Sequence, residues 1–393
     1  MSKLKVAVIY GGASPEHEVS IITAVQAMAA MPKEYEVIPL YVTKEGKVIT
    51  DPVLFSLESY RNLPLLEQMA EHVNLPISPL AHTPTPTHPK LFTNKSGRPF
   101  DILFPMFHGG VGEGGWIQGL AEYYQIPMVG TGLTGAALGM DKIGMKSAFA
   151  GAKIPQAKYT WFYRQEWTQN QAPLLKKITS SLHFPLFVKP SRGGSSIGTT
   201  KVHNQTELIQ ALDVAATLDT RLVVEEGIEN AREINISVMG NAGTDLEYSA
   251  CEEVFHTSSE FFDFTDKYLT GGKTKGMASA DRVIPANIPP ATVSKIRSLA
   301  GTIFNLLDCA GLVRIDFLIK EKDVYVIEIN TIPGSLSFFL WDKASYSYPQ
   351  LLSHLIELAL THYQESSKTR TEFASPILAN PTLGSKLGKK LSR

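Results

Sequence analysis

The clearest alternation of hydrophobic and polar positions in this chain lies between residues 313 and 330. The stretches VRIDF and VIEIN both alternate apolar and polar residues, which is the period of a pleated strand. A short polar turn at Glu321–Asp323 separates the two stretches. We therefore predict two strands that form an antiparallel hairpin centred on Lys322.

The predicted register of this hairpin gathers charged side chains on one face of the sheet. It places Asp316 opposite Glu328 and Arg314 opposite Asn330. Two carboxylates in such positions repel each other unless a cation lies near them. A donor set of Asp, Glu and Asn suits Mg²⁺ or Mn²⁺, and Mg²⁺ commonly takes phosphate oxygens as further ligands. From these residues alone, a metal site and a solvated face with cross-strand ion pairs are both compatible with the pattern.

The N-terminal third of the chain has the pattern of a parallel α/β sheet. Leu4–Tyr10 is a short, strongly apolar run that predicts a buried strand, and Val37–Val42 predicts a second one. Between them we predict a helix from an N-cap at Ser14 to about Met31. Sites in such units lie at the carboxyl ends of the strands, where Glu16 would lie, although a carboxylate there also suits a capping role.

Further apolar runs extend this pattern. The run DILFPMF predicts a third buried strand, which leads to His108 and a glycine-rich loop; a satisfied core histidine is the alternative role for His108. Ile126–Val129 predicts a fourth strand, and Thr134–Gly151 predicts one continuous helix. The proline-rich run AHTPTPTHPK lies in an irregular insertion, for which we predict a single helix near Leu63–Val73.

A second group of strands follows after residue 152. Phe187–Pro190 predicts a strand that leads to the glycine- and serine-rich loop Ser191–Gly198. Backbone N–H groups of such a loop bind anions, and Lys189 adds a positive charge, although a hairpin tip has a similar composition. The polar stretch His256–Gly276 suggests a lid over a site. Further strands are predicted at Arg221–Glu226, Glu233–Gly240 and Glu247–Val254, and helices at Ala291–Leu307 and Pro349–Tyr363.

Composition places the chain among ordinary globular proteins. Its 393 residues allow two or three domains, and 44% of them are hydrophobic and 19% charged. A net charge of −1 gives no electrostatic reason to expect nucleic acid or an anionic membrane as a partner. Cys251 and Cys309 form no metal-binding pair, and no apolar run is long enough to span a membrane. We expect a cytoplasmic protein without a signal peptide.

The order of the motifs resembles the ATP-grasp ligases, and more narrowly the D-alanine–D-alanine ligase family. The motifs are GGASPEHEVS, HGGVGEGGWIQGLAE, KPSRGGSSIG, FFDFTDKYL, RIDF and EINTIPG, spread over about residues 4–340. The resemblance implies a three-domain α/β protein whose C-terminal part is α+β. We expect a substrate-binding N-terminal parallel-sheet domain at 1–133 with an insertion at about 43–99, a central subdomain at 134–229, a C-terminal subdomain at 230–365 and a disordered tail at 366–393.

The resemblance also implies which residues bind ATP and metal. It assigns the ATP phosphates to Lys142, Lys189 and the glycine-rich loop at Ser196, and the adenine to Glu225, Glu226 and the backbone near Ile228. Glu233 would bind a ribose hydroxyl. Two Mg²⁺ or Mn²⁺ ions would be bound by the hairpin residues Asp316, Glu328 and Asn330.

The remaining roles implied by the resemblance concern the reaction itself. Lys267 would contact the transferred phosphate, Arg314 and the Gly334 backbone N–H would stabilise a tetrahedral intermediate, and His108 would lie near an acyl phosphate. A hydrogen-bonded trio would bind the ammonium group of the first D-alanine. Its members are Glu16, Ser195 and Tyr268.

The activity implied is ATP-dependent ligation of two D-alanines through a D-alanyl phosphate, for peptidoglycan precursor synthesis. The partners are then small molecules, and the family habit suggests a homodimer. One position departs from the family, because Phe339 stands where a serine usually binds the second substrate. Two alternatives follow: Ser335 or Ser337 replaces that serine in a shifted register of the loop, or Phe338, Phe339 and Trp341 form a more apolar acceptor pocket. Alternatives are a ligase with another acceptor, such as D-lactate, D-serine or a bulkier amino acid, and a non-catalytic nucleotide-binding module.

Overall fold

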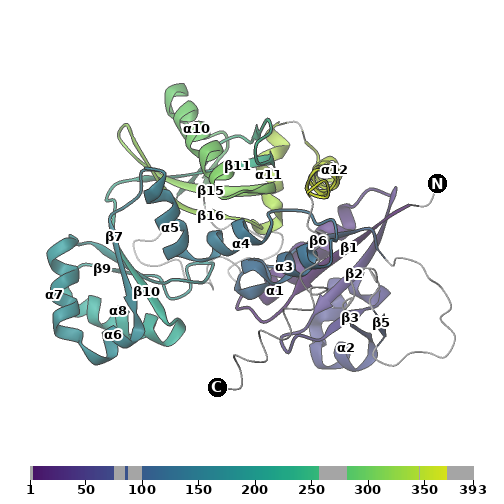
Figure 1. The fold of residues 1–393 in the computed structure, drawn as a ribbon, viewed down its shortest axis with the longest axis horizontal. Helices are drawn as coiled ribbons and strands as arrows, with labels where there is room; N and C mark the ends of the chain where they lie inside the picture. The colour runs from purple at the N-terminus through teal and green to yellow at the C-terminus, as the bar shows by residue number, and fades with distance from the viewer. Residues whose placement is uncertain (1–2, 75–84, 87–99, 256–280, 345, 370–393) are drawn as a thin grey trace, which may run out of the picture.

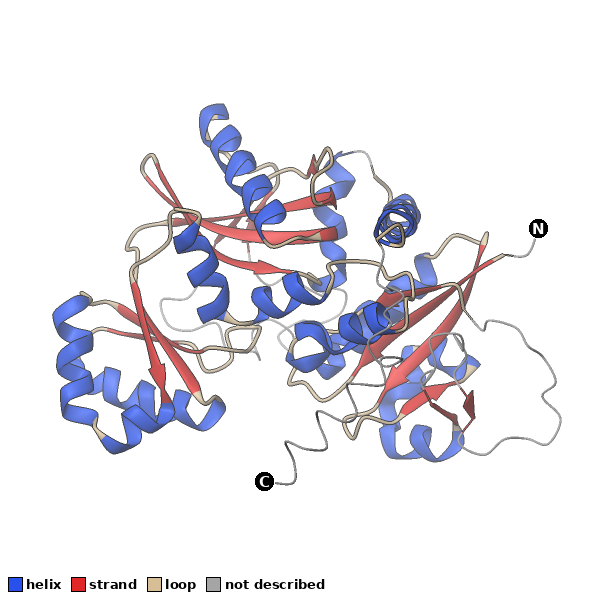
Figure 2. Cartoon of the chain, viewed as in Figure 1, coloured by secondary structure: helices blue, strands red, loops and turns tan. Residues whose placement is uncertain are grey.

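The structure is a computed structural model that describes residues 3–74, 85–86, 100–255, 281–344 and 346–369. Its strands form three sheets, and helices cover their faces (Figures 1 and 2). The mixed α/β class that the sequence predicts is confirmed. Within the described residues, no helix is both long and apolar enough to cross a membrane.

The N-terminal sheet has the strand order β5-β4-β3-β2-β1-β6, and β1 lies parallel to both β2 and β6. Alternate side chains of β1 enter different hydrophobic clusters, Val8 and Tyr10 in one and Ala7 and Ile9 in the other. Both faces are therefore buried, which explains the unbroken apolar run. The elements are β1 (Leu4–Gly11), α1 (His17–Ala30), β2 (Tyr35–Val42), β3 (Val48–Thr50), η1 (Pro52–Phe55), η2 (Leu57–Asn62), α2 (Leu63–Met69), β4 (Glu71–Asn74), β5 (Thr85–Pro86), β6 (Ile102–Pro105), η3 (Gly112–Trp116) and α3 (Ile117–Tyr123).

The central sheet is antiparallel, with the order β7-β10-β8-β9. One hydrophobic cluster joins it to its helices, and Trp167, Leu212 and Leu222 belong to that cluster. The glycine-rich loop connects β8 and β9 along the chain, so the sheet presents this loop at one edge. The elements are α4 (Leu133–Met140), α5 (Lys142–Gly151), β7 (Tyr159–Tyr163), α6 (Arg164–Gln169), α7 (Gln171–Ser181), β8 (Leu186–Pro190), β9 (Thr200–Val202), α8 (Gln205–Leu218) and β10 (Arg221–Glu226).

The C-terminal sheet has the order β14-β13-β11-β15-β16, and β12 pairs with β11. Apolar residues on one face, such as Ile236 and Phe317, pack against α10 and α5. The strand alternation directs the polar residues to the opposite face. The elements are β11 (Arg232–Asn241), β12 (Glu247–Tyr248), β13 (Glu252–Phe255), β14 (Asp281–Val283), α10 (Pro290–Leu306), β15 (Ala310–Lys320), β16 (Asp323–Asn330), η4 (Gly334–Ser337), α11 (Phe338–Trp341), η5 (Asp342–Ala344) and α12 (Tyr348–Ser366).

The predicted hairpin register is confirmed at the polar positions, since Asp316 pairs with Glu328 and Arg314 pairs with Asn330. The turn itself is shorter than predicted, because Lys320 already pairs with Asp323. A β-bulge beside Asp316 inserts one residue into β16 and restores the predicted pairing beyond it.

The predicted single helix at 134–151 is wrong, because the chain breaks at Asp141 into α4 and α5. Asp141 has extended backbone angles and caps α5, where its Oδ1 accepts hydrogen bonds from the N–H groups of Ile143 and Gly144 at 3.1 and 3.0 Å. It also accepts a hydrogen bond from Ser191 Oγ at 3.0 Å. The break therefore fixes the start of α5, and with it Lys142, against the glycine-rich loop.

The predicted helix start at Ser14 is also wrong, because α1 begins at His17. Ser14 Oγ instead accepts a hydrogen bond from the Glu16 N–H at 3.0 Å and donates one to the His108 carbonyl at 2.7 Å. This serine therefore connects two loops at the carboxyl edge of the sheet. Other predicted elements are shorter or divided: α2 ends at Met69, β12 and β13 are separate strands, and Ile126–Val129 forms only an isolated bridge between Met128 and Leu103.

Candidate active site

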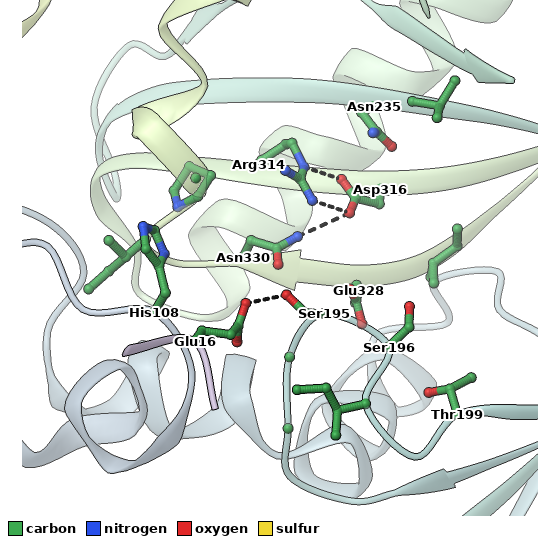
Figure 3. Close-up of a pocket in the computed structure, with 18 of the residues that line it drawn as sticks. Glu16, His108, Ser195, Ser196, Thr199, Asn235, Arg314, Asp316, Glu328 and Asn330 are labelled. Carbon is green, nitrogen blue, oxygen red and sulfur yellow. Dashed lines mark hydrogen bonds and ion pairs between the residues drawn. The ribbon is translucent and has the colours of Figure 1, made fainter. Parts of the chain in front are cut away.

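The three sheets surround a cavity of about 280 Å³ (Figure 3). A second pocket of about 910 Å³ adjoins it and shares six of its lining residues, Lys189, Ser196, Thr199, Glu233, Val254 and Ile327. The first pocket contains most of the predicted catalytic and metal-binding residues, and the second contains those predicted to bind adenine. The first is lined by Glu16, His108, Lys142, Lys189, Ser195, Ser196, Glu233, Arg314, Asp316, Glu328, Asn330 and Gly334, and the second by Lys189, Ser196, Glu225, Glu226, Ile228 and Glu233.

Two predicted residues, Lys267 and Tyr268, lie outside the described residues, as does the predicted lid His256–Gly276. Every other predicted site residue therefore borders one of the two pockets. These residues extend from Glu16 to Gly334 in the sequence, and the packing of the three sheets brings them together.

The polar face of the C-terminal hairpin forms one wall of the cavity (Figure 3). Arg314 donates two hydrogen bonds to Asp316, from Nε to Oδ1 at 2.7 Å and from Nη2 to Oδ2 at 2.8 Å, and Asn330 Nδ2 donates to Asp316 Oδ2 at 3.0 Å. Burial raises the pKa of Asp316, while Arg314 opposes this rise and Glu328 adds to it. The bidentate pair of Arg314 with Asp316 thus orients this face, and the Glu328 carboxylate lies beside it.

This donor set fits a divalent cation that also binds phosphate. Asp316, Glu328 and Asn330 offer hard oxygen ligands, which Mg²⁺ and Mn²⁺ prefer. Among the residues that the structure describes, no three His, Cys, Asp or Glu side chains are arranged to hold a metal. Asp316, Glu328 and Asn330 could hold such an ion together with phosphate oxygens and water.

A buried ion-pair cluster lies where the two pockets meet. The Glu225 carboxylate contacts the ammonium of Lys189 and lies 2.6 Å from the ammonium of Lys146, measured from Oε2 to Nζ. Burial alone would raise the pKa of Glu225, but the two lysines lower it to about 2. The carboxylate is thus engaged by two cations, which it helps to hold in place, while its contact with adenine stays a prediction.

Lys146 was missed by sequence reasoning. It lies four residues after Lys142 on α5, so both side chains project from the same face of the helix. This spacing was a usable signal once Lys142 had been singled out. The side chain of Lys146 is only 3% exposed, and a buried lysine needs a partner such as Glu225.

Replacement of Lys146 by methionine is expected to destabilise the fold. It leaves Glu225 with one cation, and breaking a buried ion pair costs about 3 kcal/mol at the lower end of the usual range. Chemical denaturation of the purified variant measures this loss. Lys176→Met, on the exposed side of α7, is the control and should leave the free energy of unfolding unchanged. Equal stability of both variants would show that Lys146 does not support Glu225.

Three loops converge on Glu16. Ser195 Oγ donates a hydrogen bond to Glu16 Oε1 (Figure 3). A Cβ atom on either Gly109 or Gly194 would lie 2.4 Å from Glu16 Oε2, so a side chain at either position would displace the Glu16 carboxylate. Gly109 also has a φ of +65°, which favours glycine. The predicted pairing of Glu16 with Ser195 is therefore present, and it joins the N-terminal sheet to the glycine-rich loop.

His108 borders the cavity as an uncharged side chain. It is 4% exposed, and its Nε2 lies 2.9 Å from Thr23 Oγ1. Burial lowers its pKa to about 4, so the imidazole is neutral near pH 7. His108 can therefore exchange a hydrogen bond with a substrate but does not contribute a positive charge.

Glu113 is a second buried residue that sequence reasoning missed. Its carboxylate accepts hydrogen bonds from the Gly109 N–H at 2.8 Å and from the Ile332 N–H at 3.4 Å. It thus bridges the loop after β6 and the turn after β16. The glycines around Glu113 indicated a loop near the site. The sequence carried no signal that Glu113 would pair with Ile332, which lies 219 residues away.

The stability of the fold is expected to depend on the charge of Glu113. Burial raises its pKa from 4.5 to about 8, and the charges of Glu16 and Glu328 add to the rise. The Glu113 carboxyl group therefore holds its proton more tightly in the folded chain than in the unfolded chain. The resulting stabilisation is complete below about pH 4.5 and is lost as pH rises towards 8. In Glu113→Gln, Tm should fall less between about pH 5.5 and 8.5 than in the wild type. Parallel Tm profiles of the two proteins would contradict this origin.

The segment after Gly334 contains Ser335 and Ser337, the two candidate replacement serines. Ser335 Oγ donates to Gln26 Oε1 at 3.0 Å, and Ser337 Oγ is buried without a hydrogen-bond partner in the described part of the chain. Neither serine lines the cavity, whereas Phe339 does. This arrangement favours the alternative of a more apolar acceptor pocket, and the residue that contacts the acceptor stays a prediction.

Comparison with known proteins gives one consistent relationship. Family models described as the D-ala D-ala ligase N-terminus and C-terminus match residues 5–131 and 148–357. The D-alanine–D-alanine ligase of Bacillus cytotoxicus is 37% identical over 381 residues, which cover 94% of this chain and 99% of the relative. A solved D-Ala:D-Ser ligase, VanG from Enterococcus faecalis, has a TM-score of 0.75 and 29% identity, over 91% of this chain and 99% of that one. The D-alanine–D-alanine ligase of Coxiella burnetii has a TM-score of 0.76 and 27% identity, over 94% and 97%.

Proposed function

This chain belongs to the D-alanine–D-alanine ligase family, and we propose that it joins two D-alanines into D-alanyl-D-alanine, a peptidoglycan precursor, at the expense of ATP. The observation that carries this proposal is the shared cavity. It unites two lysines, a carboxylate and amide wall, a buried arginine and the Glu16–Ser195 pair. These are the groups that phosphoryl transfer followed by acyl transfer requires.

The first step forms an acyl phosphate. The carboxylate oxygen of one D-alanine attacks the γ-phosphorus of ATP, and ADP leaves. Lys142 and Lys189 would hold the phosphates, with the loop around Ser196 over them. Asp316, Glu328 and Asn330 would hold Mg²⁺ or Mn²⁺, two ions in our proposal, which neutralise phosphate charge when bound.

The nucleotide base and ribose would occupy the second pocket. Glu226 and the backbone near Ile228 would contact adenine, and Glu233 would bind a ribose hydroxyl. All three border this pocket, which also contains Lys189. Because Lys189 lines both pockets, the phosphates would lie at the junction between them.

The second step forms the peptide bond. The neutral amine of the second D-alanine attacks the acyl carbon, phosphate leaves, and the nitrogen loses a proton. Arg314 and the Gly334 N–H would stabilise the oxyanion, and His108 would hydrogen-bond near the acyl phosphate. Glu16, supported by Ser195, would bind the ammonium of the first D-alanine. Lys267 and Tyr268 keep the roles implied by the family as proposals.

The direct test is ADP release by the purified protein with Mg-ATP and either D-alanine or L-alanine, with product masses read by mass spectrometry. D-alanine should stimulate ADP release and yield the dipeptide, and L-alanine should not. Chelation should stop turnover, and added Mg²⁺ or Mn²⁺ should restore it. Absence of any D-alanine-dependent ADP release would overturn the proposed function and favour a nucleotide-binding module.

A different acceptor is the second candidate, and Phe339 on the cavity wall is the observation that favours it. The same assay with D-alanine mixed with D-serine or D-lactate distinguishes the two. A mixed product, with slow turnover on D-alanine alone, would identify another acceptor.

We also propose that the enzyme is a cytoplasmic homodimer, as the family habit and the use of ATP suggest. Light scattering on the purified protein tests the dimer.

A further inference from the structure

Arg282 is a cation on the cavity wall to which neither the sequence pattern nor the family assigns a role. It lies on β14, where it pairs with Val254 of β13, and it lines the same cavity as Arg314 and Phe339. Its guanidinium carbon lies 5.1 Å from the centre of the Phe339 ring. This distance is in the range of a cation–π contact, which holds the guanidinium beside the ring.

The hydrogen bonding of Arg282 leaves donor capacity unused. Nη1 donates to Glu252 Oε1 at 3.0 Å, but Nε is buried and has no hydrogen-bond partner in the described part of the chain. Glu252 is itself 1% exposed, and its other oxygen lies 3.5 Å from Asn235 Nδ2. The guanidinium is therefore anchored on one side, and a buried donor without a partner is costly unless a ligand satisfies it.

Among the described residues, the other cations that line this cavity also have anionic partners, and the proposed reaction already gives each of them a task. Arg314 directs two donors at Asp316, Lys189 contacts Glu225, and Lys142 lies 4.0 Å from Glu328. In the proposed reaction, the two lysines bind ATP phosphates and Arg314 stabilises the oxyanion. None of them is then available for a further substrate carboxylate.

A second amino acid necessarily brings such a carboxylate into the cavity. Only its amine reacts, so its carboxylate stays charged and needs a cationic partner when it is removed from water. We propose that Arg282, supported by its cation–π contact with Phe339 and anchored by Glu252, binds the carboxylate of the acceptor amino acid. This inference rests on the proposed ligase function. It gives Phe339 a purpose, because the ring supports an ionic contact where the family uses a hydroxyl group.

The test compares two acceptors in the full-length enzyme. D-Alaninamide has the reactive amine of D-alanine but no carboxylate, so it can act as an acceptor and cannot be phosphorylated as a donor. In Arg282→Gln, KM for D-alanine as acceptor should rise about 10- to 100-fold, the usual worth of a charge-assisted hydrogen bond. KM for D-alanine as donor and KM for ATP should stay near their wild-type values. The preference for D-alanine over D-alaninamide, read as dipeptide against dipeptide amide by mass, should fall by the same factor.

Arg297→Gln is the matched control, because Arg297 also lies over an aromatic ring, 5.8 Å from the centre of Tyr248, but lines neither pocket. It should leave both acceptors unaffected, and Arg282→Lys should recover part of the preference. Phe339→Leu provides a second route if Arg282→Gln fails to fold, and it should also raise the acceptor KM. An unchanged acceptor KM and an unchanged preference in the folded variants would overturn the inference, whereas a wild-type enzyme inactive with D-alanine would overturn the proposed function itself.

Discussion

Glu328→Gln is expected to reduce kcat by about a thousandfold while the protein remains folded. The carboxylate lies on the cavity wall opposite Asp316 in the hairpin register. If it is a metal ligand, its loss removes several kcal/mol of charge stabilisation from the phosphoryl-transfer step, which corresponds to this fall in rate.

Glu328→Gln is expected to change stability far less than it changes rate. The charge of Glu328 contributes to the raised pKa of the buried Asp316, so the two carboxylates repel each other in the protein without metal. Neutral glutamine removes this repulsion, but it also removes the attraction to Lys142, whose Nζ lies 4.0 Å from Glu328 Oε2. Because the two changes oppose each other, the Tm of the variant should stay near that of the wild type.

Three measurements check this prediction: kcat by coupled ADP release, Tm by calorimetry, and Mn²⁺ binding in the presence of ADP by electron paramagnetic resonance. Glu247→Gln is the matched control, since Glu247 is a strand glutamate that lines neither pocket. It should retain full activity and metal binding. Near-wild-type turnover or Mn²⁺ affinity in Glu328→Gln would remove the hairpin from the metal site.

Arg314→Lys is the prediction with the second largest effect, a loss of kcat of about 10²- to 10³-fold. Lysine keeps the positive charge, but it cannot make the two parallel hydrogen bonds that Arg314 donates to Asp316. The ammonium would therefore be poorly placed to stabilise an oxyanion. Because this contact matters only in the transition state, KM for ATP should change little.

Steady-state kinetics with varied ATP and D-alanine separate these effects. The control is Arg297→Lys, because Arg297 lines neither pocket and lysine retains its positive charge. Both kinetic constants of this variant should equal those of the wild type. A large rise in KM with an unchanged kcat would assign Arg314 to ground-state binding. Wild-type values for both constants would contradict any role in the reaction.

The local sequence pattern was enough to predict the position of a side chain where that position depends only on the strand or helix that carries it. The period of two in VRIDF and VIEIN predicted that Asp316 and Glu328 would face each other, and the structure confirms it. The bulge beside Asp316 was not predictable, because it depends on how the strand fits its neighbours. Similarly, the apolar run at the N-terminus predicted a buried parallel strand, but the helix after it begins later than its serine suggested, since that serine bonds to another loop.

The order of motifs by itself therefore determined the family, the α/β class and a set of site residues of which every described member borders one of the two pockets. Only the tertiary structure decided which distant groups meet there. Lys146 with Glu225, Glu113 with Ile332, and Arg282 with Phe339 are pairs whose members lie far apart in the chain. Periodicity reports which face of an element is buried, but not which element covers it. The packing of the sheets determines which group pairs with a buried charge. The ion pair or hydrogen bond that compensates for removing that charge from water forms only in the folded chain.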